Sequence, residues 1–440
     1  MFAWTKESSL KDPDQKVMIT NFNSTILVLI RDPQYAKGFF AKPHLYKKSG
    51  NADILKPLAD GGLVMLEGEA WKRHRKIISN SFHYESLRAH ISIVKKTVKE
   101  FFDKLTAEDL KSYSALDKLQ EITGEVVGRV FFGEKLGDYT HEGHSLTVAR
   151  THLVADLMDV CMSPLAVFFG KYALEYPITP RFKTLKRGID SIRQLCFQIV
   201  QDRKESSPES HDLLASLLET QKLSDPELWF AVIEIVDEFI TFFVAGMDTT
   251  GHLCTMILYD LLPHPENLKT LEQERNETYN KEDTVTVDTL QAMNELYSVI
   301  KETMRAHSPA AWPFYRVALV DHKIGEFAVK KGTWIRVELL ALSHHRKYHQ
   351  SPEDYNPGRW KETARIDPYA FVPFAAGPRN CIGQHLAIAE TKVIISEFLE
   401  RFDYKVKDGY ELRMSQKFLY EPADEMIFEL KSKRQRQNYF

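Results

Sequence analysis

The stretch that decides the fold of this 440-residue chain is Phe374-Ala375-Ala376-Gly377-Pro378-Arg379-Asn380-Cys381-Ile382-Gly383. A helix is predicted to begin just after it, near Gln384. A cysteine at a helix N-terminus, among backbone N–H groups and beside an arginine, is favoured as the thiolate, and a thiolate can ligate a metal. The alternative for Cys381 is an inert structural cysteine, which most buried free cysteines are. In this glycine-containing loop we favour the ligand, because glycine lets the backbone approach another group closely.

Upstream of this loop, three charged residues form a second pattern. Glu302 and Arg305 lie three residues apart in a helical stretch, so they share a helix face and can form an ion pair. This spacing alone is weak evidence, since an exposed helical ion pair is the commoner explanation. Arg359 follows in the segment 355–360, between that helix and the cysteine loop, and this order strengthens the pattern.

One helix should cross the whole domain. Ser224 and Glu227 form a capping box, with Pro226 inside the first turn. Helical sequence then continues without a proline to Leu262, and Pro263 ends it. The middle of this helix is nearly all apolar, which predicts that it lies in the core.

The same helix has a polar centre, Ala245-Gly246-Met247-Asp248-Thr249-Thr250-Gly251. Glycine weakens a helix, and threonine can bond back to a carbonyl one turn earlier. A glycine, an acid and two threonines in a buried helix conflict with packing, and such conflicts tend to mark function. An acid beside an alcohol can relay protons, which we favour for Asp248 and Thr249. For Thr250 a satisfied hydrogen bond between helices explains the residue at least as well.

A basic helix is predicted around residues 71–76. Trp71 and Arg75 lie four residues apart and share one face. We expect the remaining basic residues to point outward, as an ordinary solvated helix face: Lys72, Arg73 and Lys76.

The rest of the chain predicts helices and a smaller β-rich part. Residues 16–21 and 25–30 have a hairpin pattern, Asp32-Pro33 is a helix start, and strand-like sequence returns at 317–336. No repeat, low-complexity segment or Gly/Ser linker divides the chain. We therefore expect one interlocked domain over residues 1–440, mainly α with a smaller β-rich part.

Composition excludes several classes of protein. The 58 basic and 61 acidic residues nearly cancel, which gives no global attraction to nucleic acid. No signal peptide is visible, and the apolar runs are far too short to span a bilayer. The four cysteines form no CxxC pair, so no disulfide framework is expected: Cys161, Cys196, Cys254 and Cys381.

In order along the chain, these motifs resemble the cytochrome P450 family. The cysteine loop matches the family's F-x-x-G-x-R-x-C-x-G pattern at every specified position. Five such matches arise by chance with odds on the order of one in 10,000 for a chain of this length. The charged pair matches the family's E-x-x-R element, the basic helix its W-x-x-x-R element, and the polar helix centre its A/G-G-x-D/E-T element. In the segment 355–360, Pro357 and Arg359 match the family's P-E-R-F segment, whereas Gly358 and Trp360 depart from it.

The resemblance implies the cytochrome P450 fold, with the long central helix over haem b (iron protoporphyrin IX) and Cys381 as the ligand of its iron. It implies a catalytic proton relay through Asp248 and Thr249. It also implies a structural cluster of Glu302, Arg305 and Arg359 behind the haem. The cofactor-binding residues that it implies are Trp71, Arg75, Arg316, Phe374, Gly377, Arg379, Cys381 and Gly383.

The implied activity is monooxygenation of a small apolar organic substrate with dioxygen. The electrons must come from a flavoprotein reductase or a ferredoxin, because the chain has no flavin or NAD fingerprint. The basic helix 71–76 is a surface that an acidic partner could use. We expect the substrate pocket to be formed by residues 242–249, the segment 310–314 with Trp312, and the loop before Trp71.

The resemblance leaves localisation divided between two expectations. Microsomal family members carry an N-terminal membrane helix and a proline-rich hinge, and this chain shows neither. If the native chain carries an anchor, we expect it at the endoplasmic reticulum membrane surface, and otherwise in the cytoplasm. Any membrane association is then not encoded by a transmembrane helix here.

Two other functions compete with monooxygenation. A haem-thiolate enzyme can rearrange a hydroperoxide or an oxime without electrons, but family members of that kind often lose the acid–alcohol pair or alter the cysteine loop. A haem-based binding or sensor protein would not need a proton relay. Asp248 and Thr249, together with the undisturbed loop, favour the monooxygenase over both.

Overall fold

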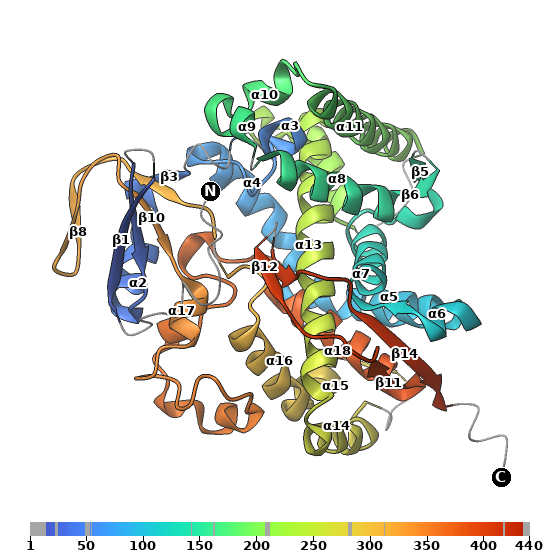
Figure 1. Cartoon of the computed structure of the whole chain (residues 1–440). Coiled ribbons are helices and arrows are strands. Elements are labelled where there is room, and N and C mark those ends of the chain that lie inside the picture. The colour runs from blue at the N-terminus through green and yellow to red at the C-terminus, as the bar shows by residue number, and fades with distance from the viewer. Residues whose placement is uncertain are drawn as a thin grey trace, which may run out of the picture.

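The β-rich part of the chain lies beside a larger helical part, through which one long helix passes (Figure 1). The structure is a computed structural model that describes residues 15–22, 25–48, 53, 55–141, 143–161, 163–206, 212–279, 284–311, 313–416 and 419–433. It confirms the expected fold class, mainly α with a smaller β part.

The helices are α2 (Pro33–Phe40), α3 (Lys56–Ala59), α4 (Gly68–Ile78), α5 (Tyr84–Asp103), α6 (Ala107–Lys111), α7 (Ala115–Phe131), α8 (Leu146–Cys161), α9 (Pro164–Phe169), α10 (Tyr172–Glu175), α11 (Pro180–Ser206), α12 (Leu213–Glu219), α13 (Val232–Leu261), α14 (Pro265–Glu277), α15 (Val287–Ala292), α16 (Asn294–Ala306), α17 (Leu339–Ser343) and α18 (Gln384–Arg401). The strands are β1 (Val17–Phe22), β2 (Thr25–Ile30), β3 (Tyr46–Lys48), β4 (Tyr113–Ser114), β5 (Thr140–His141), β6 (His144–Ser145), β7 (Arg316–Ala318), β8 (His322–Ile324), β9 (Phe327–Val329), β10 (Trp334–Val337), β11 (Phe402–Val406), β12 (Met414–Gln416), β13 (Tyr420–Pro422) and β14 (Ile427–Ser432).

The largest sheet joins distant parts of the chain in the order β1-β2-β10-β7-β3. Strands β1 and β2 form the expected antiparallel hairpin, and β10 adds to β2 in parallel. Helix α2 covers this sheet, with Val28, Ile335 and Ala36 in one small core. The Asp32 side chain caps α2 by accepting the Gln34 N–H at 2.9 Å, as its position before Pro33 predicts.

The central helix is α13, and it begins later than the capping pattern predicts. Residues 226–228 form a single 3-10 turn, in which Asp225 accepts the Glu227 N–H at 3.0 Å. The chain then stays extended because the Phe230 N–H donates to the Thr220 hydroxyl at 3.1 Å. The α-helix starts at Val232 and ends at Leu261, just before Pro263. The expected start at Ser224 was therefore wrong, whereas the expected end is confirmed.

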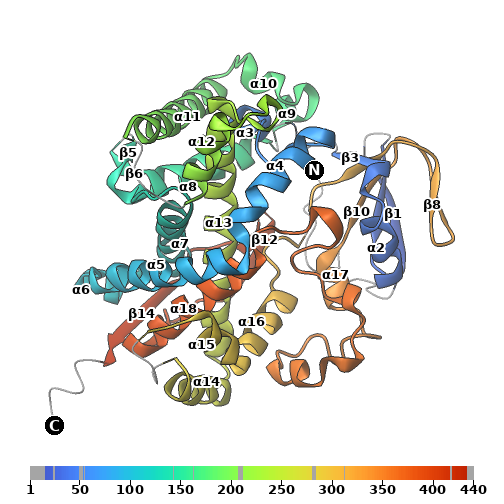
Figure 2. The same ribbon diagram turned by 180° about the vertical axis from the view of Figure 1, so that it is seen from behind.

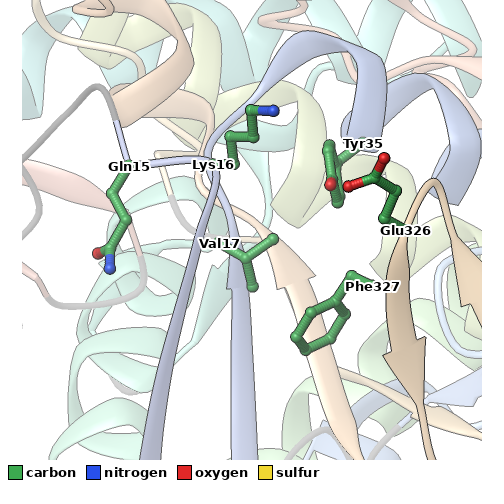
Figure 3. A pocket seen from close by; sticks show the side chains of 6 residues that line it. All are labelled: Gln15, Lys16, Val17, Tyr35, Glu326 and Phe327. Atoms are coloured by element: carbon green, nitrogen blue, oxygen red, sulfur yellow. The ribbon is translucent and has the colours of Figure 1, made fainter.

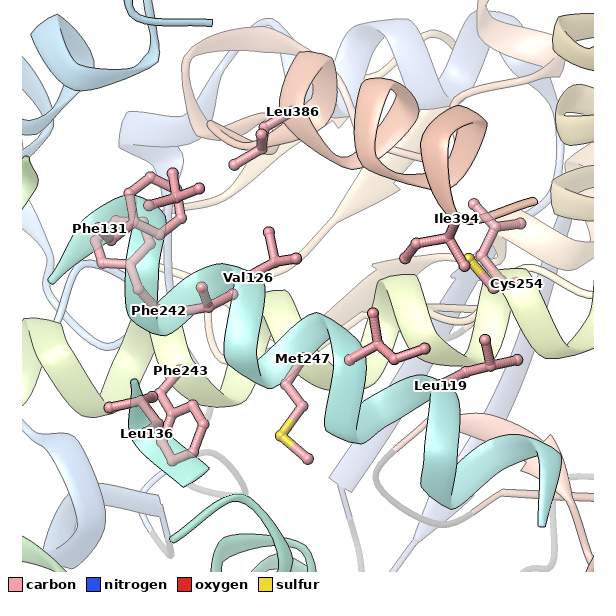
Figure 4. Packing of buried hydrophobic residues seen from close by; sticks show 14 of the residues in the cluster. Leu119, Val126, Phe131, Leu136, Phe242, Phe243, Met247, Cys254, Leu386 and Ile394 are labelled. Carbon is pink, nitrogen blue, oxygen red and sulfur yellow. The ribbon is translucent and has the colours of Figure 1, made fainter. Parts of the chain in front are cut away.

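Helix α7 packs very closely against α13, and glycines make this possible. A Cβ at Gly251 would lie 2.8 Å from the Gln120 backbone, and one at Gly246 would lie 2.6 Å from Val127. The Thr123 hydroxyl of α7 also donates to the Met247 carbonyl at 2.7 Å. Figure 4 shows side chains of α7, α13 and α18 gathered in one cluster. The glycines in the centre of α13 thus have a packing role in addition to any role in chemistry.

A buried charge cluster joins α16 to the segment after α17. Both Glu302 and Arg305 are fully buried, and Arg305 donates to the two Glu302 oxygens at 2.9 and 3.0 Å. The Arg359 Nε donates to Glu302 at 3.1 Å, and so does the Trp360 indole N–H at 2.9 Å. The indole, where the family has phenylalanine, therefore adds a fourth donor group, because the Asn356 N–H also binds Glu302 at 2.8 Å.

None of the helices in the described ranges has both the length and the apolar character that crossing a bilayer requires.

We expect Gly251→Ala to destabilise the protein by about 1–3 kcal/mol, because the added methyl group overpacks the contact with the Gln120 backbone. A urea titration followed by circular dichroism measures this as a lower unfolding midpoint. Gly188→Ala in α11 is the control, since its Cβ would meet only the end of the Leu153 side chain, at 3.0 Å. Equal midpoints for the two variants would show that α13 can move away from α7 at little cost.

We expect Glu302→Gln to cost about 3–5 kcal/mol, because it leaves two buried guanidinium groups without their carboxylate. Burial alone would raise the pKa of Glu302, but the hydrogen bonds and charge of Arg305 outweigh it, so the pKa lies below 4.5. The contribution of this group to stability is therefore complete above pH 4.5 and is lost as the pH falls through the lowered pKa. Urea midpoints measured from pH 7 to pH 3 should show a gap between wild type and variant that narrows with acid. The control is Glu353→Gln at an exposed ion pair, and a gap independent of pH would contradict the assignment.

Candidate functional site

The cysteine loop has a strained backbone just before α18. Ala375 has φ +58° and Gly377 has φ +73°, a region that residues other than glycine rarely adopt. The Ala375 N–H donates to the Val372 carbonyl at 2.9 Å, and the Cys381 N–H donates to the Phe374 carbonyl at 2.9 Å. The loop thus turns tightly from Phe374 to Cys381, and strain of this kind concentrates at functional sites.

The two glycines of the loop differ in what they contact. A Cβ at Gly377 would lie 2.6 Å from the Phe40 carbonyl oxygen at the end of α2. The positive φ and the close contact with Phe40 are enough to explain why position 377 is a glycine. The expected close approach to the cofactor is not needed to explain it. A Cβ at Gly383 would make only an ordinary contact of 3.7 Å with Phe82. No described protein neighbour therefore requires glycine at 383.

The Cys381 side chain is enclosed by protein and still accessible. Burial raises the pKa of its thiol, while the Gly383 N–H and the charge of Arg75 lower it. The effect of burial prevails and the pKa of the Cys381 thiol is raised, so the protein groups alone do not favour the expected thiolate. Nevertheless Cys381 presents accessible surface, unlike the buried Cys196 and Cys254. A thiol that is enclosed and accessible fits a ligand position for a bound metal, which would supply the remaining stabilisation of the thiolate.

The middle of α13 also presents accessible surface, although the helix is buried along most of its length. Ala245 is exposed and Thr249 is partly exposed, whereas Met247 and Thr250 are buried. The Thr249 hydroxyl donates to the Ala245 carbonyl at 2.8 Å, and Asp248 is buried. Helix α18, which begins three residues after Cys381, packs against α13. One accessible face therefore belongs to the central helix and another to the cysteine loop at the start of its neighbour.

Basic side chains from four separate segments gather beside the loop. Arg75 of α4 donates to the backbone and side-chain oxygens of Asn380 at 3.0 and 2.9 Å. The Arg379 guanidinium lies 3.9 Å from the centre of the Trp71 ring and donates to the Leu66 carbonyl at 2.7 Å. This contact brings together the predicted residues of α4 and of the loop.

Arg316 and Lys48 complete the cation cluster, which we define as Lys48, Arg75, Arg316 and Arg379. Arg316 lies 3.5 Å from the Glu67 carboxylate, and Lys48 donates to the Leu66 carbonyl at 3.2 Å. Sequence reasoning missed Lys48, because β3 reaches the cluster only by pairing with β7 in the sheet. Its signal was limited to a basic pair, Lys47-Lys48, in a short strand-like stretch.

Basic groups outnumber carboxylates in the cation cluster, where Glu67 lies beside Arg316. Burial and the charges of Arg316 and Arg379 lower the pKa of Lys48 to about 6, against an opposing effect of Glu67. Burial and neighbouring arginines also lower the pKa of Arg379 to about 10. Such shifts indicate cations that repel one another in a partly desolvated place. A group that carries two carboxylates, as haem b does, fits this cluster.

Two basic residues of α4, Arg73 and His74, point toward α13, although we expected Arg73 to point outward. Arg73 donates to the Trp229 carbonyl at 2.6 Å and pairs with Glu234, so the prediction that it points outward was wrong. His74 is fully buried and hydrogen-bonded to the buried Glu238 at 2.7 Å. These contacts fasten α4 to α13, which it crosses when the molecule is seen from behind (Figure 2). Only tertiary contacts with α13 distinguish Arg73 from exposed Lys72 and Lys76.

The expected substrate-pocket segments lie partly within the described residues. Phe242 and Phe243 are buried in the main core, while Trp312 lies outside the described residues. A separate shallow hollow of about 370 Å³ lies on the β-rich part, lined by Lys16, Tyr35 and Phe327 among others (Figure 3). It contains none of the predicted site residues.

Comparisons with known proteins identify the family of this chain. The family model described as Cytochrome P450 matches residues 10–427. The chain is similar to Cytochrome P450 734A1 of Arabidopsis thaliana, with 27% identity over 89% of this chain and 75% of the relative. It is also similar to a cytokinin hydroxylase of the same plant, with 27% identity over 79% of this chain and 67% of the relative. A third relative, Cytochrome P450 3A14 of Cavia porcellus, is 28% identical to the chain over 92% of this chain and 83% of the relative.

These matches span nearly the whole chain and agree with the mainly helical fold. The protein binds haem b and is a haem-thiolate monooxygenase that uses an organic substrate, dioxygen and a redox partner. It belongs to the cytochrome P450 family.

Proposed function

We propose that the enzyme inserts one atom of dioxygen into a small apolar organic substrate between the cysteine loop and the middle of α13. The observation that carries this proposal is the contact of Arg75 with Asn380. It links the cation cluster directly to the residue before the accessible Cys381. A thiolate ligand and a site for two carboxylates thus adjoin, as a haem requires.

The loop residues would hold the cofactor from one side. Cys381 would supply the thiolate, with its negative charge favoured by the Gly383 N–H and the nearby Arg75. When bound, haem with a thiolate ligand supplies the activation of dioxygen, because the thiolate pushes electron density that favours O–O cleavage. Phe374 and Gly377 would fix the shape of the loop through the backbone contacts described above.

The cation cluster would hold the propionates. Arg75, Arg316 and Arg379 can each donate to a carboxylate through a planar guanidinium group. Lys48 joins them as a fourth donor, and Trp71 positions Arg379 by stacking beneath it. Glu302, Arg305 and Arg359 would act at a distance, by fastening the segment that leads into the cysteine loop.

Thr249 and Asp248 would manage protons at the accessible face of α13. The Thr249 hydroxyl proton is held by the Ala245 carbonyl, and a rotation of the side chain would release it to a water molecule at that face. The buried carboxyl group of Asp248, the residue directly before Thr249, would supply the replacement proton. An acid and an alcohol in this order form a relay from the interior of the helix bundle to the reacting face.

The electrons would enter from a flavoprotein reductase or a ferredoxin at the face of α4. Lys72 and Lys76 are exposed on this helix, and the adjoining Arg75 contacts the loop that bears Cys381. Basic exposed residues raise the rate of encounter with an acidic partner. The partner therefore docks close to the proposed iron ligand.

We also propose that the enzyme works at a membrane surface, such as that of the endoplasmic reticulum, and not in the aqueous cytoplasm. Four large apolar side chains are exposed in the segment that runs from the end of α9 to the start of α11: Phe169, Tyr172, Tyr176 and Ile178. Exposed apolar residues that gather in one segment are typical of contact with lipid or with another protein.

Residues 1–440 would act as a single catalytic domain. The sheet pairs β2 near the N-terminus with β10, and β14 near the C-terminus pairs with β4. Neither the segment that bears β2 nor the segment that bears β14 can therefore be separated from the rest without breaking a sheet.

Cys381→Ser should abolish the strongly red-shifted Soret band that the reduced protein shows with carbon monoxide. The physical reason is that an alcohol is too weak an acid to replace the thiolate. The measurement is the carbon monoxide difference spectrum of the purified, haem-loaded protein. Cys196→Ala, in α11, is the control and should keep the band. A variant at 381 that keeps the shifted band would reject the ligand assignment.

Thr249→Ala should lower the product formed per electron pair by at least about tenfold, with peroxide released instead, because the proton relay loses its last donor. Product, peroxide and consumed reductant are measured together in the reconstituted enzyme. Thr250→Val, on the buried side of α13, serves as the matched control. Unchanged coupling in Thr249→Ala would rule out the relay.

A further inference from the structure

Glu67 is an acid placed inside the cation cluster. It is the residue before α4 and precedes Gly68, whose φ of +58° directs the chain into the helix. One Glu67 carboxylate oxygen accepts the Lys48 backbone N–H at 2.5 Å and lies 3.5 Å from the Arg316 guanidinium. The side chain is 37% exposed, so it lies at the border between the cluster and solvent.

Basic groups outnumber carboxylates around Glu67. Its carboxylate opposes the lowering of the pKa of Lys48, Arg316 and Arg379. Arg316 and Arg379, together with Lys48, therefore share one carboxylate, which occupies the same region in which these basic groups would bind the cofactor's carboxylates. In a loaded protein the same Glu67 would be a like charge beside the propionates.

We propose that Glu67 is a competing counter-ion that weakens the retention of haem. This inference rests on the proposed assignment of the cation cluster to the haem propionates. Before loading, Glu67 partly neutralises the cluster and keeps the repelling cations together. After loading it repels the propionates, and its exposure to solvent keeps that repulsion modest and sensitive to salt.

The test uses Glu67→Gln, which removes the charge and keeps an amide oxygen to accept the Lys48 N–H. The holoprotein is mixed with excess apomyoglobin, and haem transfer is followed by the Soret absorbance. We expect transfer from the variant to be about three- to tenfold slower than from wild type at low salt. The difference should shrink as the salt concentration rises.

Glu69→Gln is the matched control, because Glu69 lies two residues after Glu67, in the first turn of α4, is 86% exposed and pairs with Lys72. Its rate of haem loss should equal that of wild type. Unchanged or faster haem loss in Glu67→Gln would overturn the proposal, since faster loss would mean that Glu67 organises the cations for the haem.

A second variant separates this proposal from the assignment on which it rests. Arg316→Gln should accelerate haem loss if the cluster binds the propionates. If Arg316→Gln has no effect on haem loss, the cluster is not the propionate site, and the inference about Glu67 fails with it. If Arg316→Gln accelerates haem loss while Glu67→Gln leaves it unchanged, only the competing role of Glu67 is wrong.

Discussion

Helix α13 packs closely against α7, and this packing determines which face of α13 is left accessible. Gly251 lets α13 approach the backbone of α7, and Gly246 leaves room for the Val127 side chain. The hydrogen bond from Thr123 to the Met247 carbonyl fixes the register of the two helices. With one side of α13 fixed in this way, the surface around Ala245 and Thr249 stays accessible on a helix that is otherwise core. A buried scaffold and a reactive face can therefore share the same two turns.

Charge is distributed in opposite ways in the scaffold and in the site. Around Glu302 each buried charge has its partner, and backbone carbonyls take up the remaining donors of Arg305. In the cation cluster, three of the four basic groups (Lys48, Arg316 and Arg379) share a single carboxylate, that of Glu67. In the Glu302 cluster, carboxylate and backbone carbonyl oxygens accept the guanidinium N–H groups, and these hydrogen bonds lock the chain. In the cation cluster, the excess of basic groups over carboxylates leaves binding capacity for an anionic group.

The cysteine loop connects these two regions. Its residue Ala375 is strained at φ +58°, and Gly377 lies close to the Phe40 carbonyl, so the surrounding fold supplies the energy that this turn costs. The segment before the loop is fastened by Arg359 and Trp360 to Glu302. Contacts of the segments before and after Cys381 therefore hold this residue in place.

The sequence by itself determined the features that depend on neighbours along the chain: the β1–β2 hairpin, the Asp32 cap of α2, the end of α13 before Pro263, and the cysteine motif that identifies the family. Tertiary structure decided what depends on distant partners. The start of α13 shifted to Val232 because Thr220 holds Phe230, and Arg73 turned inward because Glu234 faces it. Lys48 entered the cation cluster through strand pairing with residues some 270 positions away. Local patterns carry backbone preference and helix-face periodicity, whereas long-range contacts form only when packing brings separate segments together.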